Sequence, residues 1–508
     1  MNQHGGAQDT LGDTLRRAAR KHRDRPALAF RDRTWTFEEL YGAAQSVGAN
    51  LLARGLNPGD RVAACGRNTD AYFIAWLGCA AAGLVHVPVN FGLTAEEVSY
   101  IVRQSGARAM LCDAERLPLM RSIPEADRLS FVGTFEGDQE FDVLAAARRG
   151  DALAAPPIRG DDLAQLQYTS GTTAAPKGAM VTHRGLFIHY LACIHDLDFE
   201  ARDRCLAALP LYHTAQTHAY TMPQTLSGAM TRLIQGPEPE RVFEIVAAER
   251  INSFFAPPTV WISLLRHPAF DSYDLSSLEK VYYGASIMPV PVLEELRRRL
   301  PNAGLYNVYG QTEVGPVATV LRPEEHEARP ASAGRPVITV ETRIVDEHLH
   351  DVPAGTLGEI VHRSPQLLVG YWERPDETEA AFRGGWFHSG DLGYADAEGY
   401  IYVVDRVRDV INTGGVLVAS REVEEALFSH PAVSEAAVIA LPDPKWIEAV
   451  VAVVVLRQGM EVEAATLIEH VRGRLAAHKA PKRVIFADSL PRNASGKILK
   501  RELRQQHS

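Results

Sequence analysis

Cysteine is scarce in this sequence, and the few thiols are scattered. The chain has 508 residues but only five cysteines, Cys65, Cys79, Cys112, Cys193 and Cys205, and no two of them form a Cys-x-x-Cys pair. So few thiols argue against a disulfide framework, and the missing pair argues against a structural zinc site. Such usage is typical of a reducing compartment, so we predict a cytoplasmic protein.

Long hydrophobic runs and targeting signals are also lacking. The first ten residues are polar and contain no apolar segment of the kind that begins a secreted protein. The most apolar stretch, residues 73–89, is interrupted by Gly78, Gly83, His86 and Pro88. That pattern favours a buried helix followed by a buried strand, and we expect no integral membrane segment.

Positive charge is not in excess. The chain has 53 Lys and Arg against 63 Asp and Glu, a formal net charge of -10, which argues against a dedicated nucleic-acid binder. Hydrophobic residues make up 46% and charged residues 23%, near the average for globular proteins, so disordered and fibrous classes are excluded. At roughly 150 residues per domain, the length predicts about three folding lobes.

Helix-like and strand-like segments alternate through the N-terminal part of the chain. A helical pattern over 35–52 is followed by a strand at 61–64, an apolar helix at 72–82 and a strand at 85–89. The alternation recurs over 241–300. Alternation of this kind predicts two α/β lobes in which largely parallel strands are covered by helices.

The character of the sequence changes twice in the C-terminal part. Residues 334–405 are rich in Gly, Pro, Asp and short β-branched runs, which predicts a β-rich subdomain. Beyond it, amphipathic segments at 422–428 and 464–475 flank an apolar strand at 450–456. We therefore predict an α/β fold with a large N-terminal domain, 1–404, made of two α/β lobes and the β-rich subdomain, and a small α+β C-terminal domain, 405–508.

The strongest local motif is a loop rich in hydroxyls between two strand-like stretches. It reads Tyr-Thr-Ser-Gly-Thr-Thr-Ala-Ala-Pro-Lys-Gly over residues 168–178. Small residues let backbone N–H groups approach an anion, hydroxyls add donors, and Lys177 adds a positive charge. The composition predicts a phosphate-binding loop without Walker A spacing, and a polar turn with a solvated lysine is the alternative.

Four further motifs follow in order along the chain. They are Tyr-Gly-Gln-Thr-Glu at 309–313, Ser-Gly-Asp at 389–391, Asp-Arg-Val-Arg-Asp-Val-Ile-Asn-Thr-Gly-Gly at 405–415 and Pro-Arg-Asn-Ala-Ser-Gly-Lys at 491–497. With the loop at 168–178, this series resembles the adenylate-forming superfamily of acyl-CoA synthetases, firefly luciferase and peptide-synthetase adenylation domains. Within it, the chain looks closest to bacterial fatty-acyl-CoA synthetases.

The resemblance implies a nucleotide site and a role for each motif. The ATP phosphates would be bound by Thr169, Ser170, Gly171, Thr172, Thr173 and Lys177. The adenine and ribose would be bound by Gly284, Ala285, Tyr309, Gly310, Gln311, Asp391 and Arg406. Mg²⁺ would be held by Glu313 and Thr172, since this ion prefers one or two carboxylates together with phosphate oxygens. A core aromatic is the plain alternative for Tyr309, and a surface ion pair for Glu313.

The same resemblance implies a catalytic set of Lys497, Thr312, Glu313 and His213. The carboxylate of the acid must attack the α-phosphorus of ATP, so two anions converge. A lysine that bridges both would stabilise the charge that develops in the transition state. Thr312 would donate to the α-phosphate, and His213 would lie near the substrate carboxylate.

The acid itself is only partly defined by the sequence. The resemblance places it between residues 209–219, 256–261 and 283–287, where Gly284 and Ala285 leave room for an acyl group. Residues 216–220 contain no carboxylate that would bind an α-amino group. We therefore expect an aromatic or a medium-to-long fatty acid in place of an amino acid.

CoA is the leading expectation for the acceptor of the acyl group. Asp405 resembles the hinge about which the small C-terminal domain moves, and Gly414 and Gly415 would leave room for the pantetheine arm of CoA. Trp446 stands where similar ligases offer a ring to the CoA adenine. The leading hypothesis is therefore an acyl-CoA synthetase that uses ATP, Mg²⁺ and CoA.

Two departures from the family pattern keep an alternative open. Leu417 stands where an asparagine is common, and His478 where an aromatic residue usually precedes the lysine segment. Both favour an ATP-dependent amide bond synthetase, in which an amine captures the acyl-adenylate without CoA. A third hypothesis, from another class, is a non-catalytic nucleotide-binding protein.

Overall fold

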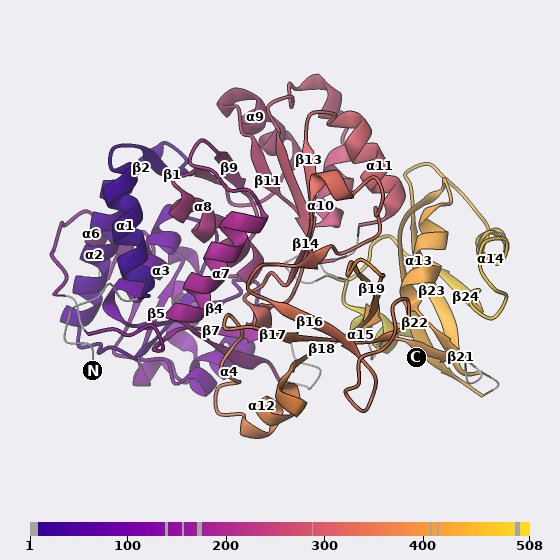
Figure 1. Cartoon of the computed structure of the whole chain (residues 1–508). Coiled ribbons are helices and arrows are strands. Elements are labelled where there is room, and N and C mark those ends of the chain that lie inside the picture. The colour runs from indigo at the N-terminus through magenta and orange to yellow at the C-terminus, as the bar shows by residue number, and fades with distance from the viewer. Residues whose placement is uncertain are drawn as a thin grey trace.

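The structure is a computed structural model of the chain, in which helices α1 (Leu11–His22) and α2 (Phe37–Ala53) lie on one side of the molecule and strands β23 (Ile447–Leu456) and β24 (Arg483–Phe486) on the opposite side (Figure 1). It describes residues 9–137, 141–154, 157–169, 175–286, 288–406, 409–413, 416–444, 446–492 and 498–507. In these residues the strands form four sheets, covered by helices as the sequence predicts for an α/β protein.

The first lobe is built on a six-stranded sheet in the order β6-β5-β3-β4-β7-β8. Adjacent strands of this sheet pair in parallel, except β7 and β8, which are antiparallel. The strands are β3 (Arg61–Cys65), β4 (Val85–Val89), β5 (Ala109–Cys112), β6 (Phe131–Thr134), β7 (Leu163–Thr169) and β8 (Lys177–Thr182). The helices of this part are α1 (Leu11–His22), α2 (Phe37–Ala53), α3 (Asp70–Ala82), α4 (Ala95–Ser105), α5 (Leu117–Ser122) and α6 (Val143–Ala147).

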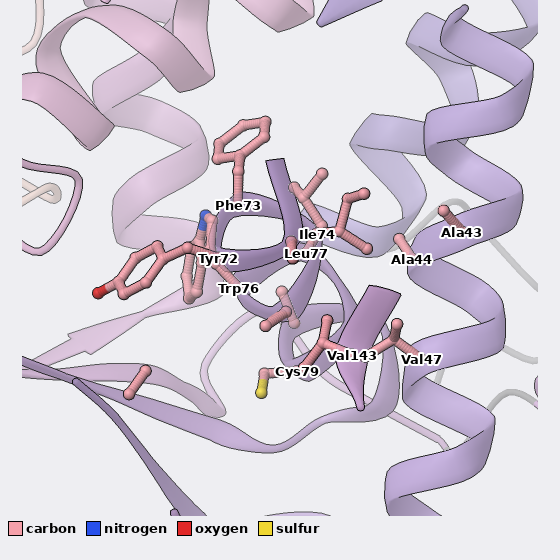
Figure 2. Close-up of a cluster of buried hydrophobic side chains, with 14 of the residues drawn as sticks. Ala43, Ala44, Val47, Tyr72, Phe73, Ile74, Trp76, Leu77, Cys79 and Val143 are labelled. Carbon is pink, nitrogen blue, oxygen red and sulfur yellow. The ribbon is translucent and has the colours of Figure 1, made fainter. Parts of the chain in front are cut away.

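Helix α3 is the apolar segment that the sequence predicts to be buried, and every one of its residues is buried. Figure 2 shows its side chains beside Ala43, Ala44 and Val47 of α2. The two helices can approach closely because Gly48 has no side chain. A Cβ at this position would lie only 2.9 Å from the carbonyl oxygen of Gly78. Among the described residues, no helix has the length and apolar character needed to cross a membrane.

Helix α2 begins later than the sequence pattern suggests. Trp35 and Thr36 belong to strand β2 (Arg33–Thr36), and the helix starts at Phe37. The Thr36 side chain accepts from the Glu39 backbone N–H at 3.2 Å, while the Glu39 carboxylate accepts from Thr36 N at 2.8 Å. This reciprocal capping box fixes the helix start and overrides the apolar periodicity upstream.

The second lobe is built on a nine-stranded sheet in the order β15-β14-β13-β12-β11-β9-β10-β1-β2. Its strands beyond β2 are β1 (Pro26–Phe30), β9 (Arg204–Ala207), β10 (Met230–Leu233), β11 (Ser253–Phe255), β12 (Lys280–Gly284), β13 (Gly304–Tyr309), β14 (Thr319–Leu321) and β15 (Arg335–Pro336). The helices are α7 (His183–Asp196), α8 (Met222–Ser227), α9 (Pro239–Glu249), α10 (Pro258–Arg266) and α11 (Val290–Arg299). Because β10, β9, β11, β12 and β13 run parallel, their carboxyl ends meet at one edge, where open α/β sheets bind ligands.

A buried ion pair ties the start of β9 to β12. The Lys280 ammonium lies 2.8 Å from the Asp203 carboxylate, and the two side chains are 9% and 0% exposed. We expect Asp203→Ala to lower the free energy of unfolding by about 3 kcal/mol, because the buried ammonium loses its nearest carboxylate and keeps only the exposed Glu200, 3.5 Å away. Urea denaturation measures this effect; Glu341→Ala, in the exposed pair with Arg363, is the control and should change little. Equal urea midpoints of unfolding for Asp203→Ala and Glu341→Ala would contradict the prediction.

The third and fourth sheets correspond to the two C-terminal regions in which the sequence changes character. Residues 341–406 form an antiparallel sheet of β16 (Glu341–Val345), β17 (Gly358–Arg363), β18 (Phe387–Ala395) and β19 (Ile401–Arg406), with α12 (Pro375–Ala381) beside it. The last sheet contains β20 (Ile411–Thr413), β21 (Val416–Val418), β22 (Val433–Asp443), β23 (Ile447–Leu456) and β24 (Arg483–Phe486), with helices α13 (Ser420–Phe428), α14 (Ala464–Arg472) and α15 (Lys500–His507). Strand β23 is central, as the apolar run at 450–456 predicts. The sequence pattern does not predict its long antiparallel partner β22.

Candidate active site

Two glycines at the carboxyl edge of the nine-stranded sheet are required by close backbone approach. Gly284 ends β12, and a Cβ there would lie 2.2 Å from the carbonyl oxygen of Val308 on the parallel neighbour β13. Gly310 follows β13, and a Cβ there would lie 2.0 Å from the carbonyl oxygen of Pro316. The next residue after β12, Ala285, has a φ of 62°, a strained conformation of the kind that concentrates at functional sites.

Glu313 stands at the centre of a small polar cluster. It lies on the 3₁₀ turn Thr312–Val314 and is 9% exposed. Its Oε1 accepts hydrogen bonds from Thr169 Oγ1 at 3.3 Å and from Tyr371 OH at 3.1 Å. Lys177 Nζ lies 5.2 Å from the centroid of the Tyr371 ring. The fold thus brings Thr169 of the hydroxyl-rich loop next to Glu313, and Lys177 over the ring of Tyr371, which itself donates to Glu313.

Tyr371 is a site residue that the sequence reasoning missed. It bridges to Ala179 of β8, and the flanking Trp372 N–H donates to Gly178 O at 2.8 Å. Burial and the Glu313 carboxylate raise the pKa of its phenol, so the hydroxyl stays protonated and acts as a donor. Its partner lies 58 residues away in the sequence, and no local pattern marks such a contact.

The residues around Glu313 fit a magnesium ion that is shared with a phosphate ligand. Among the described residues, no three His, Cys, Asp or Glu side chains come together as a metal site would require. A single carboxylate with hydroxyl neighbours suits Mg²⁺, which keeps several waters and takes further oxygens from phosphates. Thr172, the other expected ligand, lies outside the described residues.

A second polar cluster surrounds Asp391 on β18, which is 4% exposed. Its Oδ2 accepts from Tyr309 OH at 2.7 Å, and its Oδ1 lies 2.6 Å from Arg406 Nε on the paired strand β19. Gln311 Nε2 donates to Ser389 O at 3.3 Å, which ties the two motifs together. Burial, and then the Asp391 carboxylate, raise the pKa of Tyr309. Each carboxylate oxygen has two lone pairs, so Asp391 retains capacity to accept from hydroxyls of a ligand.

His213 lies on the segment that leaves β9, and a distant asparagine holds that segment in place. Asn68, 3% exposed, donates from Nδ2 to Leu209 O at 2.8 Å and accepts from Leu211 N at 2.8 Å. Beside His213, Thr214 Oγ1 lies 3.1 Å from Thr312 Oγ1. The structure therefore brings the His213 segment against the motif at 309–313 through Thr214, while Asn68 fixes the segment; the sequence predicts neither contact.

Several expected site residues cannot be placed in this arrangement. Lys497 and a set of loop residues lie outside the described residues: Ser170, Gly171, Thr172, Thr173, Gly414 and Gly415. The described neighbours of the Lys497 loop, Arg492 and Ile498, pair in an antiparallel bridge. Trp446 lies between β22 and β23 in the last sheet, where Lys482 Nζ is 4.8 Å from its ring centroid.

The expected hinge residue Asp405 makes a specific local contact. Its Oδ2 accepts from both the backbone N–H and the hydroxyl of Ser420, at 2.7 and 2.6 Å. Ser420 begins α13, so the carboxylate is placed at a helix N-terminus, where negative charge is favoured. Burial raises the pKa of this carboxyl group. Asp405 thus connects the end of β19 to the first helix of the C-terminal part.

Comparisons with known proteins identify relatives over nearly the whole chain. The AMP-binding enzyme family matches residues 15–372, and the AMP-binding enzyme C-terminal domain matches residues 422–497. A feruloyl-CoA synthase from Amycolatopsis sp is 37% identical, over 97% of this chain and 98% of that protein. The long-chain-fatty-acid–CoA ligase FadD13 from Mycobacterium tuberculosis is 34% identical, over 93% of both. The solved structure of amide bond synthetase McbA from Marinactinospora thermotolerans matches with a TM-score of 0.89 at 26% identity, over 98% of this chain and 100% of that one.

The chain therefore belongs to the AMP-binding enzyme family. It is an ATP-dependent ligase of the adenylate-forming type, related to acid–CoA ligases, with the fold that such enzymes share. The resemblance and the fold class that the sequence motifs indicated are thus confirmed, and the hypothesis of a non-catalytic protein is set aside.

Proposed function

We propose that this enzyme adenylates a carboxylic acid with ATP and then transfers the acyl group to the thiol of CoA. The observation that carries the proposal is the convergence of the Glu313 cluster, the Asp391 cluster and the His213 segment around the carboxyl edge of one sheet. An anionic nucleotide needs hydroxyl donors and a cation, its ribose needs an acceptor-only carboxylate, and an acid needs an adjacent cavity.

Within this proposal the described residues divide the work of binding and orientation. Thr169 and Lys177 bind phosphate oxygens, and Asp391, oriented by Tyr309 and Arg406, accepts from the ribose hydroxyls. The remaining residues expected at the nucleotide, Gly284, Ala285, Gly310 and Gln311, shape the adenine site. Glu313 holds Mg²⁺, which when bound neutralises phosphate charge.

The residues nearest the reaction act on the acid and the α-phosphate. Thr312, placed against Thr214, donates to the α-phosphate, and His213 orients the acid carboxylate. Lys497 balances the charge of the two anions as they meet. Pyrophosphate then leaves, and the acyl-adenylate remains for attack by the thiol.

We also propose that residues 1–404 form the nucleotide- and acid-binding domain and that residues 405–508 form a mobile domain. Asp405 is the proposed hinge, because it links the last strand of one sheet to the first helix of the next. Rotation there would exchange the Lys497 loop for Gly414, Gly415 and Trp446, which would receive CoA.

An amide bond synthetase is the second candidate, because the likeness to McbA covers 98% of this chain and because Leu417 and His478 depart from the CoA-ligase pattern. The test is mass spectrometry of products formed from ATP, Mg²⁺ and a panel of acids, with CoA, with amines or with neither. We expect acyl-CoA only when CoA is present. Amide formed efficiently without CoA, and no thioester when CoA is supplied, would establish the second candidate.

A further prediction concerns Tyr371 as the residue that positions Glu313. We expect Tyr371→Phe to raise the Mg²⁺ concentration for half-maximal pyrophosphate release about 10-fold, since it removes the hydroxyl that orients the carboxylate. The matched control is Tyr400→Phe, which removes a hydroxyl bonded at 2.7 Å to Glu325. A Mg²⁺ dependence that shifts equally in both variants, or in neither, would contradict the assignment.

A further inference from the structure

A cavity opens where β9, β11 and β12 end side by side, next to the residues assigned to the acid. The residues that decide its chemistry are Leu209 and His213 after β9, Gln216 on the π-helical turn η3 (Ala215–Thr221), Phe255 at the end of β11, and Ala285 after β12. The cavity is narrow: its space amounts to about 240 Å³ with the solvent at its mouth included, but its walls leave room for only about one water-sized sphere. An acid that enters must displace part of the wall, and a small ligand displaces least.

The wall of this cavity is apolar and uncharged. No aspartate, glutamate, lysine or arginine stands among the described residues that line it. The Gln216 amide is committed to the protein, because its Oε1 accepts from Leu209 N at 3.2 Å and its Nε2 donates to Thr221 Oγ1 at 3.0 Å. The body of the acid that enters must therefore be uncharged and largely apolar.

Stacked rings close the cavity behind Phe255. The Tyr220 ring stacks on the Phe255 ring with centroids 4.1 Å apart and an angle of 15°. Tyr282 lies 5.3 Å from Tyr220, and Tyr306 lies 4.8 Å from Tyr282. All of these rings are buried. We call Tyr220, Phe255, Tyr282 and Tyr306, together with Phe199, the aromatic block.

Hydrogen bonds fasten the far side of the aromatic block. Tyr282 OH donates to Leu197 O at 2.8 Å, and Tyr306 OH donates to Asp198 Oδ2 at 2.8 Å. Asp198 in turn pairs with Arg322 at 2.7 Å. A long chain that entered past Phe255 would have to separate stacked rings and break these bonds, whereas a flat ring that ends at Phe255 leaves the block intact.

We propose that the acid site takes a short aryl acid, with the carboxylate on the ring or on a brief linker, and rejects medium- and long-chain fatty acids. This inference rests on the proposed function and narrows its substrate class. The aromatic block sets the limit on length, and Phe255 is the residue of the block that meets the substrate.

The test compares kcat/KM for pyrophosphate release with benzoate and cinnamate against octanoate and palmitate. We expect the aryl acids to exceed the fatty acids by at least about 10-fold in the unchanged enzyme. Phe255→Ala, or the milder Phe255→Leu if the first is unstable, should shift the octanoate-to-benzoate ratio toward octanoate by about 10-fold, because it opens the way toward Tyr220. The ratio of the two kcat/KM values does not depend on the fraction of the enzyme that is folded, because both values scale with that fraction.

Phe243→Ala is the matched control, since Phe243 is also buried but lies in a separate apolar cluster. We expect this variant to keep the octanoate-to-benzoate ratio of the unchanged enzyme. A preference for palmitate or octanoate in the unchanged enzyme would overturn the inference and leave the proposed function intact. An unchanged ratio in both Phe255 variants would remove the aromatic block as the limit. No pyrophosphate with any acid would overturn the proposed function and the inference with it.

Discussion

Glu313→Gln is expected to slow pyrophosphate release by ~10²-fold or more while the protein stays folded. The substitution keeps the size of the side chain and its capacity to accept from Thr169 and Tyr371, and it removes only the negative charge. A neutral amide oxygen is a much weaker ligand for Mg²⁺ than a carboxylate. The measurement is the rate of pyrophosphate release over a wide range of Mg²⁺ concentrations.

The chain offers a matched control for this experiment. Glu325 is also a largely buried carboxylate that accepts from a tyrosine hydroxyl, that of Tyr400, but it lies outside the proposed site. We expect Glu325→Gln to keep its rate of pyrophosphate release, even if its melting temperature falls. Equal rate losses in the two variants would assign Glu313 to folding and remove it from the metal site.

Lys497→Ala is expected to reduce acyl-adenylate formation by ~10²-fold or more, by analogy with the removal of other preorganised donors. The lysine is proposed to act only while the carboxylate meets the α-phosphate. Supplying the acyl-adenylate ready-made should therefore restore thioester formation with CoA to nearly the unchanged rate. Single-turnover measurement of each half-reaction separates the two steps.

Two further results decide how the lysine is interpreted. Lys479→Ala, which removes a partly exposed lysine paired with Glu422, should leave both half-reactions unchanged. If Lys497→Ala slows both half-reactions equally, the lysine supports the C-terminal part as a whole and is not specific to adenylation.

Local features of the chain, such as single helices and strands, can be predicted from the sequence because they depend on residues that are close together in it. The apolar stretch at 73–89 is α3 followed by β4, and the run at 450–456 is the core of β23, as their hydrophobic patterns predict. Where a polar side chain competes with periodicity the pattern misleads, as at Thr36, whose capping box delays the start of α2. The order of the five motifs was sufficient to identify the family.

The sequence by itself determined the family, the α/β class and the kinds of side chain available for binding a nucleotide. Only the tertiary structure decided that Tyr371 donates to Glu313, that Asn68 holds the His213 segment, and that the Tyr220 and Phe255 rings stack behind the cavity proposed for the acid. The reason is physical. Such contacts depend on the order and register of strands in a sheet, which place residues tens to hundreds apart at one edge, and spacing along the chain carries no record of that pairing.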